Sequence, residues 1–366
     1  MVSIYVQNPK WFLRPRNTDW RYLRFMLPRI QEFEPECRFY ASRSLRGAWR
    51  ANARYARQVL NRKLGYAQRD SDGSYLDRGE FARSHCDAVF CHDDFPRNAE
   101  GVPVIWQNSL LDPAMQRARG HSQEDLAAQR ALKGAGFEKA RAVQVSTRAE
   151  QLRLAGWFPH IASKFVVVPF FLPDVKPISS TQQAEKIGRK GPLRCLFVGH
   201  EAKRKGLERV YAAMTGLSSS LQQHIQLTVV SSQSDGPIHA PSLPNLRITG
   251  ALPYRAVQQL FQDSDVFLMP SFFESYGLAF PEAMAQGTIP VVPDWEVQRE
   301  IVDNGRCGIV TSGDSTEISR ILERLCDDAS YRANLSVQAR ERFLQCFDPK
   351  IVARQFHSLF RQVLGR

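Results

Sequence analysis

The most constraining feature of this 366-residue sequence is a pattern of short apolar runs alternating with helical stretches, and the pattern occurs twice. In the first half, runs rich in β-branched and aromatic residues are separated by polar periodic segments such as Glu124–Arg130. These runs are Ile4–Val6, Ala88–Cys91, Val102–Trp106, Ala142–Val145 and Phe165–Val168. Alternation of this kind predicts a parallel sheet with helices on both faces.

A second alternating series follows in the other half of the chain. Its expected strands are Arg194–Val198, Gln226–Val230, Leu246–Thr249, Val266–Met269, Ile289–Val292 and Gly308–Val310. Its expected helices are Gly206–Leu217, Tyr254–Gln262, Pro281–Gln286, Glu296–Asp303 and Thr316–Asp327. Two α/β units of similar size predict two Rossmann-like domains facing a cleft.

The domain boundaries follow from composition. Residues 173–192 are polar, rich in Pro and Gly and free of apolar periodicity, so we expect a linker between domains 1–172 and 193–347. The last segment, 348–366, has apolar residues at helical spacing. These are Ile351, Val352, Phe356, Leu359, Phe360 and Val363. They predict an amphipathic closing helix over Pro349–Leu364 that packs back towards the first domain.

Composition excludes several classes of protein. With 43% hydrophobic and 23% charged residues, the chain is not intrinsically disordered. No apolar run approaches the roughly 20 residues of a membrane span, and the first residues do not read as a signal peptide. The seven cysteines are odd in number and scattered, so we expect no disulfide framework and a cytoplasmic protein.

The net charge of +12 is unevenly distributed. Residues 1–180 carry 28 Lys and Arg against 18 Asp and Glu, a net charge of +10, which leaves +2 for the remainder. No acidic residue occurs between Glu36 and Asp70, and five arginines in that interval are spaced by three or four positions. They are Arg43, Arg46, Arg50, Arg54 and Arg57. The spacing predicts one basic face of an amphipathic helix.

Three interpretations of this arginine stripe remain open. It could be the solvated face of a structural helix, a surface for anionic lipid headgroups or a phosphorylated or lipid-linked acceptor, or a nucleic-acid surface. The second interpretation implies a peripheral protein on the inner face of the membrane. We expect no nucleic-acid partner, although a basic nucleic-acid-binding protein is kept as an alternative function.

The segment from Phe267 to Gly287 is the most informative for chemistry. A buried strand ends at Pro270 and a turn leads into a short helix, in whose first turn Pro281 is tolerated. Glu282 then lies near backbone N–H groups that attract phosphate, and Glu274 lies at the carboxyl end of the strand, where open α/β sheets bind ligands. Carboxylates beside a phosphate site accept hydrogen bonds from hydroxyls, and a sugar nucleotide offers both hydroxyls and a diphosphate. The alternative is two solvated glutamates.

This block resembles the donor-binding segment of group 1 (family 4) retaining glycosyltransferases of the GT-B fold. The matching residues are Glu274-Ser275-Tyr276-Gly277-Leu278, then Glu282-Ala283-Met284-Ala285-x-Gly287-x-x-Pro290-Val291-Val292, then Glu300-Ile301-Val302-Asp303-Asn304-Gly305-x-x-Gly308-Ile309-Val310. A second block, Cys195–Leu207, is similar to the phosphate-binding turn of that family, with Lys205-Gly206 as its Lys-Gly pair. Before residue 193 the resemblance is weak, so no acceptor residue is assigned.

The resemblance implies a role for each matching residue. Glu274 would contact the hydroxyls of the donor sugar, and Glu282 those of the ribose. Arg204 and Lys205 would neutralise the departing diphosphate; His200, directly after Gly199, is the alternative to Arg204. Backbone groups complete the expected donor site, which includes Gly199, Ser275, Tyr276, Gly277 and Leu278.

The expected activity is therefore metal-independent, retaining hexosyl transfer from a nucleoside diphosphate sugar, without a cofactor, to a glycan or lipid-linked acceptor. Neither His85-Cys86 with Cys91-His92 nor His92-Asp93-Asp94 has the spacing or context of a metal site, so we assign no metal ligand. An inactive glycosyltransferase-like scaffold is the further alternative, and the intact Glu274, Glu282 and Lys205 argue against it.

Overall fold

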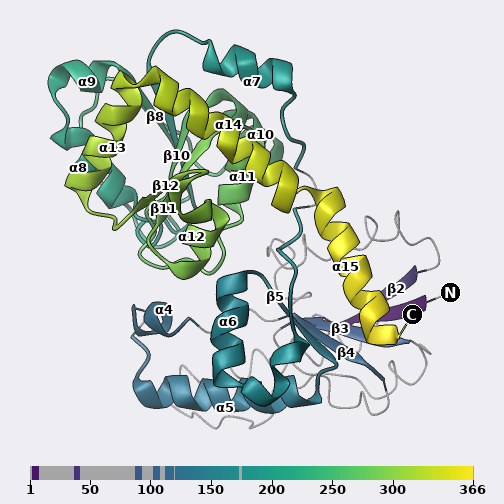
Figure 1. Cartoon of the computed structure of the whole chain (residues 1–366). Helices are drawn as coiled ribbons and strands as arrows, with labels where there is room; N and C mark the ends of the chain where they lie inside the picture. Colours follow the sequence, from purple (N-terminus) through teal and green to yellow (C-terminus); the bar gives the residue numbers. More distant parts are fainter. Residues whose placement is uncertain are drawn as a thin grey trace. The chain divides into compact units, whose positions relative to one another are not determined.

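The computed structural model describes residues 2–7, 37–41, 87–92, 102–107, 112–118, 120–172 and 175–365, which divide into two compact units (Figure 1). One unit takes in the described residues before position 112, residues 122–172 and the last helix from Val352 onward. The other takes in 112–121 and 175–351. The arginine stripe expected at 43–57 lies outside the described residues.

Within the described part of the first unit, parallel strands form a sheet in the order β2-β1-β3-β4-β5-β6. The strands are β1 (Val2–Gln7), β2 (Cys37–Ala41), β3 (Ala88–His92), β4 (Val104–Gln107), β5 (Ala142–Val145) and β6 (Phe165–Val167). The helices of this unit before its last helix are α5 (Gln123–Lys139), α6 (Arg148–Trp157) and the 3-10 turn η1 (Pro159–Lys164), whereas α4 (Pro113–Ala118) belongs to the second unit. The predicted parallel sheet is confirmed, and β2 is a strand that the sequence analysis missed.

Both faces of the first sheet are covered. On one face, Trp106 of β4 packs against Phe137 of α5, with ring centroids 5.1 Å apart. On the other, Phe90 of β3 packs edge-on against Phe356 and Phe360 of the last helix, α15 (Pro349–Leu364). The predicted closing helix and its packing on the first domain are therefore confirmed (Figure 1).

The second unit is built on another parallel sheet, in the order β12-β11-β10-β7-β8-β9. Its strands are β7 (Leu193–Val198), β8 (Ile225–Val230), β9 (Leu246–Ile248), β10 (Val266–Leu268), β11 (Ile289–Pro293) and β12 (Ile309–Thr311). Its helices are α7 (Ser180–Ile187), α8 (Leu207–Gly216), α9 (Ser219–Gln223), α10 (Tyr254–Asp263), α11 (Ala279–Ala285), α12 (Glu296–Ile301), α13 (Ser315–Asp327) and α14 (Ala329–Cys346), with a 3-10 turn η2 (Asp303–Gly305).

Alternate residues of β10 face opposite sides of this sheet. Val266 and Leu268 join the core beneath α8 and α13, whereas Phe267 packs between Phe261 of α10 and Phe280 of α11. Every residue of β10 and β11 is buried, as the continuous apolar runs of these strands predict for a sheet with helices on both faces.

The expected linker contains a helix that the sequence analysis did not predict. α7 begins with a capping box between Ser179 and Gln182, and its buried residues are the polar Gln183 and Lys186. The ammonium group of Lys186 donates to the carbonyl oxygens of Phe261 and Gln286 and to the hydroxyl of Thr288. Lys186 therefore holds α7 against the C-terminal ends of α10 and α11 through polar contacts, which a search for apolar periodicity cannot detect.

Candidate functional site

The topology of the second sheet marks one place for a ligand site. Starting from its edge strand β9, the sheet runs β9-β8-β7-β10-β11-β12, so the strand order reverses between β7 and β10. Cys195 of β7 pairs with Leu227 of β8 on one side and with Val266 of β10 on the other. Open α/β sheets bind ligands at the carboxyl ends of the strands at such a switch point. The two sequence blocks singled out above begin at this point, after β7 and after β10.

The turn after β7 leaves the Lys205 side chain half-buried. Gly199 provides the room, since a Cβ atom at this position would lie 2.3 Å from Cδ of Lys205. The turn is fixed from two sides: the carboxylate of Asp235 accepts the backbone N–H of Arg204 at 3.0 Å, and the backbone N–H of Phe272 donates to the carbonyl of Arg204 at 2.9 Å. The β7 turn and the β10 loop are thus joined through their backbones.

Glu274 and Lys205 meet at the centre of this site. The Nζ atom of Lys205 lies 3.1 Å from Oε2 of Glu274, and Nη1 of Arg204 lies 3.5 Å from the same oxygen. The Glu274 side chain is only 8% exposed. Burial by itself would raise the pKa of Glu274, but Lys205 and Arg204 outweigh burial, so the pKa lies below its ordinary value. Glu274 is therefore an ionised carboxylate held between two cations.

The two oxygens of Glu274 have different surroundings. Both cations contact Oε2, and among the described residues none donates a hydrogen bond to Oε1. An ionised carboxylate oxygen accepts hydrogen bonds only. Among the side chains and backbone groups that the structure describes, Oε1 consequently has capacity to accept from a hydroxyl group at the carboxyl edge of the sheet.

Arg204 is oriented by more than its contact with Glu274. Its guanidinium donates from Nε and Nη2 to the carboxylate of Glu201 and from Nη1 to the carbonyl oxygen of Phe273 at 2.8 Å. Burial lowers the pKa of Arg204, but Glu274 and Glu201 raise it by more, so the guanidinium stays charged. Of the two basic candidates, Arg204 is the one brought to Glu274; the ring of His200 instead lies 3.1 Å from the hydroxyl of Ser232.

The loop after β10 turns sharply at Gly277, where φ is +82°. A Cβ atom there would lie 2.5 Å from the Phe280 ring and 3.1 Å from Cγ of Glu274, so only glycine fits both the conformation and the space. Tyr276 is buried and Ser275 is exposed. The sharp turn of the loop at Gly277 therefore lies directly beside the Glu274 side chain.

The loop leads into α11. Leu278 occupies the N-cap position and Glu282 lies in the first turn, where its side chain is half-buried. Pro281 is also in that turn, and the chain turns at Gly287 directly after the C-cap residue Gln286, as the sequence predicts.

One residue that the sequence analysis did not single out contacts this loop. Gln298 of α12 is fully buried, and its Nε2 donates to the carbonyl oxygens of Glu274 at 3.3 Å and Tyr276 at 2.9 Å. Gln298 lies 24 residues along the chain from Glu274, on the helix after the next strand. Only the fold brings the two residues together.

A cavity of about 370 Å³ lies at the opposite edge of the sheet, lined by Leu193 and Ile289 at the amino ends of β7 and β11. It carries several cations, but Lys186, Arg189 and Arg332 donate to carbonyls at the C-terminal ends of α10, α11 and α13. These cations balance the negative ends of helices. The arrangement of charges therefore favours the Glu274 site over this cavity.

Sequence comparison agrees with this geometry. Residues 179–342 match the family model of the glycosyl transferases group 1. The match spans less than half of the chain, and it covers most of the second unit, from the start of α7 into α14. Glu274, Lys205, Arg204 and Gln298 all lie within it.

The curated relatives named next each match about half of the chain. An N,N'-diacetylbacillosaminyl-diphospho-undecaprenol alpha-1,3-N-acetylgalactosaminyltransferase of Campylobacter jejuni is 27% identical over 174 residues, covering 46% of this chain and 44% of the relative. A phosphatidyl-myo-inositol mannosyltransferase of Mycobacterium leprae is 26% identical over 196 residues, covering 52% of each. The chain thus spans about half the length of the curated relatives it matches.

Solved structures extend the likeness to the fold of the whole chain. Sucrose-phosphate synthase of Thermosynechococcus elongatus superposes with a TM-score of 0.65 at 15% identity, covering 100% of both chains. Anabaena HepE in complex with UDP-glucose superposes with a TM-score of 0.63 at 14% identity, covering 99% of this chain and 100% of the other. The expected GT-B fold, with two Rossmann-like domains, is therefore confirmed.

Two further expectations concern metals and membranes. No group of three or more His, Cys, Asp and Glu side chains that could hold a metal ion occurs in the described ranges, and Asp93 and Asp94 lie outside them. Among the helices of the described residues, none is long and apolar enough to cross a bilayer.

Proposed function

We propose that this protein is a metal-independent, retaining glycosyltransferase that moves a hexose from a nucleoside diphosphate sugar to a glycan or lipid-linked acceptor. The observation that carries the proposal is the convergence of Lys205 and Arg204 on Glu274 at the switch point of a group 1 glycosyltransferase domain. The two cations can face the negatively charged diphosphate, and the carboxylate can accept hydrogen bonds from the sugar hydroxyls.

In the proposed reaction, Oε1 of Glu274 accepts hydrogen bonds from hydroxyls of the donor sugar. The bond between the anomeric carbon and the diphosphate oxygen breaks, and the oxygen of the acceptor hydroxyl bonds to that carbon. The proton of the acceptor hydroxyl passes to the departing diphosphate. Negative charge grows on the diphosphate as the bond breaks, so Lys205 and Arg204 stabilise the transition state more than the bound substrate.

Other residues complete the proposed donor site. Glu282, in the first turn of α11, binds the ribose hydroxyls. The backbone around Ser275, Tyr276, Gly277 and Leu278 contacts the phosphates. Gly199 contributes mainly by leaving room for the Lys205 side chain, because a Cβ atom at position 199 would lie 2.3 Å from Cδ of Lys205.

The exposed carboxylate of Glu201 competes for Arg204, since it accepts from both Nε and Nη2 of that guanidinium. A diphosphate that binds Arg204 has to replace part of this interaction. Because the Glu201 carboxylate is exposed, solvent can take over its hydrogen bonds when Arg204 turns to the diphosphate.

The proposal for where the acceptor binds rests on the distribution of charge along the chain. The strongly basic first half, with the stripe Arg43, Arg46, Arg50, Arg54 and Arg57, fits a lipid-linked acceptor or an anionic membrane surface. Two curated relatives have names that specify lipid substrates, a diphospho-undecaprenol and a phosphatidyl-myo-inositol. We therefore propose that residues 1–172 bind the acceptor at the inner face of the membrane, and that residues 193–347 bind the nucleotide sugar.

A donor screen tests the proposal. Purified protein is incubated with UDP-, GDP- and ADP-sugars, with and without a cell-envelope lipid extract, and release of the nucleoside diphosphate is measured. We expect release from one class of donor, stimulated by the extract, and an anomeric configuration in the product equal to that of the donor. Salt-sensitive nucleic-acid binding with no turnover of any donor would favour the alternative of a basic nucleic-acid-binding protein.

A further inference from the structure

We infer that Gln298 is a positioning residue for donor-sugar transfer, which acts by fixing the backbone on which Glu274 is carried. The inference rests on the proposed function, because it concerns the same site. Gln298 is fully buried and its Nε2 joins two carbonyls of the loop, those of Glu274 and Tyr276, at 3.3 and 2.9 Å.

This contact requires a side chain that donates hydrogen bonds. Both partners are carbonyl oxygens, so the group that faces them must donate, and a primary amide supplies two N–H bonds from one nitrogen. A leucine of similar volume would leave both carbonyls without this donor in a buried place. An unsatisfied buried acceptor destabilises the structure, so we expect the loop to shift until its carbonyls find other donors.

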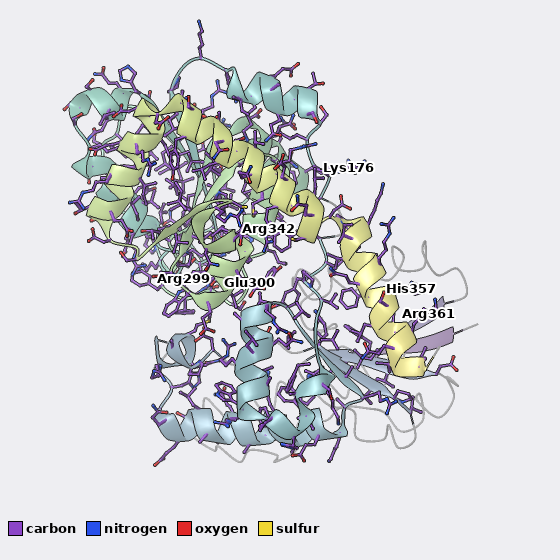
Figure 2. The ribbon with its side chains drawn as sticks, in the orientation of Figure 1. Lys176, Arg299, Glu300, Arg342, His357 and Arg361 are labelled. Atoms are coloured by element: carbon purple, nitrogen blue, oxygen red, sulfur yellow. The ribbon has the colours of Figure 1, made fainter. Side chains whose placement is uncertain are left out.

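The helix that carries Gln298 is itself anchored. Arg342 of α14 donates from Nη2 to the carbonyl oxygen of Glu300 at 3.0 Å, near the end of α12. Figure 2 labels Arg299, Glu300 and Arg342, which mark the end of α12 and its anchor on α14. Arg299, in the last turn of α12, also pairs with the exposed Asp294, which directly precedes the N-cap residue Trp295. Gln298 therefore projects from a fixed support and not from a mobile loop.

The opposing contacts explain why the backbone position matters. The side chain of Glu274 is drawn to Lys205 and Arg204, whereas its main-chain carbonyl is held by Gln298. Holding both ends of the residue fixes where Oε1 points. A displacement of about 1 Å in a positioned group can reduce a rate on the order of 10²-fold.

The experiment compares Gln298→Leu with Gln183→Leu, a matched control. Gln183 is also buried and donates from Nε2 to a backbone carbonyl, that of Ser336 at 2.9 Å, but it lies on α7. At saturating donor, we expect Gln298→Leu to lower kcat about tenfold or more, with the Kd of the nucleoside diphosphate within about threefold of wild type. Gln183→Leu should keep kcat within about twofold, although both substitutions lower the Tm.

A double variant tests whether Gln298 acts through Glu274. Added to Glu274→Gln, the Gln298→Leu substitution should lower kcat by less than about twofold further, because the group it positions is already disabled. If Gln298→Leu does not fold, Gln298→Asn keeps the amide on a shorter stem and should show the same separation of kcat from Kd.

The outcomes separate the inference from the proposed function. If Gln298→Leu or Gln298→Asn keeps the kcat of the Gln183→Leu control, or if its effect adds fully to that of Glu274→Gln, the inference is wrong while the proposed function stands. If the wild-type protein turns over no sugar nucleotide, or if Glu274→Gln is as active as wild type, the proposed function fails and the inference fails with it.

Discussion

The ammonium group of Lys205 lies 3.1 Å from Oε2 of Glu274, although the two residues belong to different connections of the second sheet and are 69 positions apart. Each side chain compensates for the burial of the other. Glu274 holds a low pKa in a buried place only because Lys205 and Arg204 are beside it. The pair is therefore a structural element as well as the proposed centre of donor recognition.

Breaking the pair from one side should destabilise the fold. We expect Lys205→Met to lower the free energy of unfolding by about 3 kcal/mol, because it leaves the Glu274 carboxylate buried beside Arg204 alone. The double variant Glu274→Gln with Lys205→Met should lose less than the sum of the single variants, since it removes both charges. Urea denaturation of the four proteins gives this coupling energy. A coupling energy near zero would show that the ion pair does not form in solution.

The buried Lys186 predicts a pH dependence of stability. Burial lowers the pKa of Lys186 to about 7, with Asp265 and Asp263 opposing and Arg189 assisting that shift, whereas its ordinary value is 10.5. Between these values the unfolded chain binds a proton that the folded protein does not, so folding becomes more favourable as pH rises from about 7. The stability of wild type relative to Lys186→Met should increase from pH 7 to 9 by at most about 1.4 kcal/mol per pH unit and stay level below pH 7.

Lys190→Met, which removes an exposed lysine from the same segment, is the control for loss of charge alone. The free energy of unfolding of wild type relative to Lys190→Met should not increase from pH 7 to 9 in this way. A Lys186→Met difference that is level from pH 6 to 9 would mean that Lys186 stays protonated in the fold.

The fold was predictable to a large extent because central strands such as β10 and β11 are buried on both faces. Continuous apolar runs such as Val266–Leu268 and Ile289–Val292 can be recognised without knowing their neighbours. The closing helix was equally clear, since its apolar residues recur at helical spacing, and those from Val352 to Val363 belong to one core beside the first sheet. α7 was missed because its buried positions are Gln183 and Lys186, whose partners lie 75 to 153 residues away in sequence.

The sequence predicted only those residues of the candidate site that stand in local motifs. Glu274, Lys205 and Arg204 stand in recognisable blocks, and the structure brings them together. Gln298 has no local signature, because its role arises from a contact across two successive strand-helix connections. The sequence also left His200 and Arg204 as alternatives, and of the two it is Arg204 that contacts Glu274.

Chelation should leave transfer intact. Lys205 and Arg204 already supply positive charge for a diphosphate, and the sequence resembles a family that generally works without a metal. With an excess of EDTA, we expect turnover within about twofold of the untreated enzyme. Complete loss of turnover that magnesium or manganese restores would instead implicate His92-Asp93-Asp94.

The arginine stripe should mediate binding to anionic membranes. Changing Arg46, Arg50 and Arg54 to Gln should weaken binding to vesicles containing anionic lipid by about 1 kcal/mol per charge, while transfer to a small soluble acceptor survives. Co-sedimentation at low and moderate salt, beside a nucleic-acid binding assay, measures this effect. If the wild-type protein ignores anionic vesicles even at low salt, where attraction is strongest, the membrane proposal is wrong.

Turnover of the donor by Glu274→Gln and Lys205→Met tests the central claim most directly. With the donor found in the screen, each variant should release nucleoside diphosphate on the order of 10²-fold more slowly than wild type, which corresponds to roughly 3 kcal/mol of lost transition-state stabilisation. The assay is run at a temperature where circular dichroism shows both variants folded, with Gln183→Leu as the control. Near-normal turnover in both folded variants would contradict the assignment of the donor site to Glu274 and Lys205.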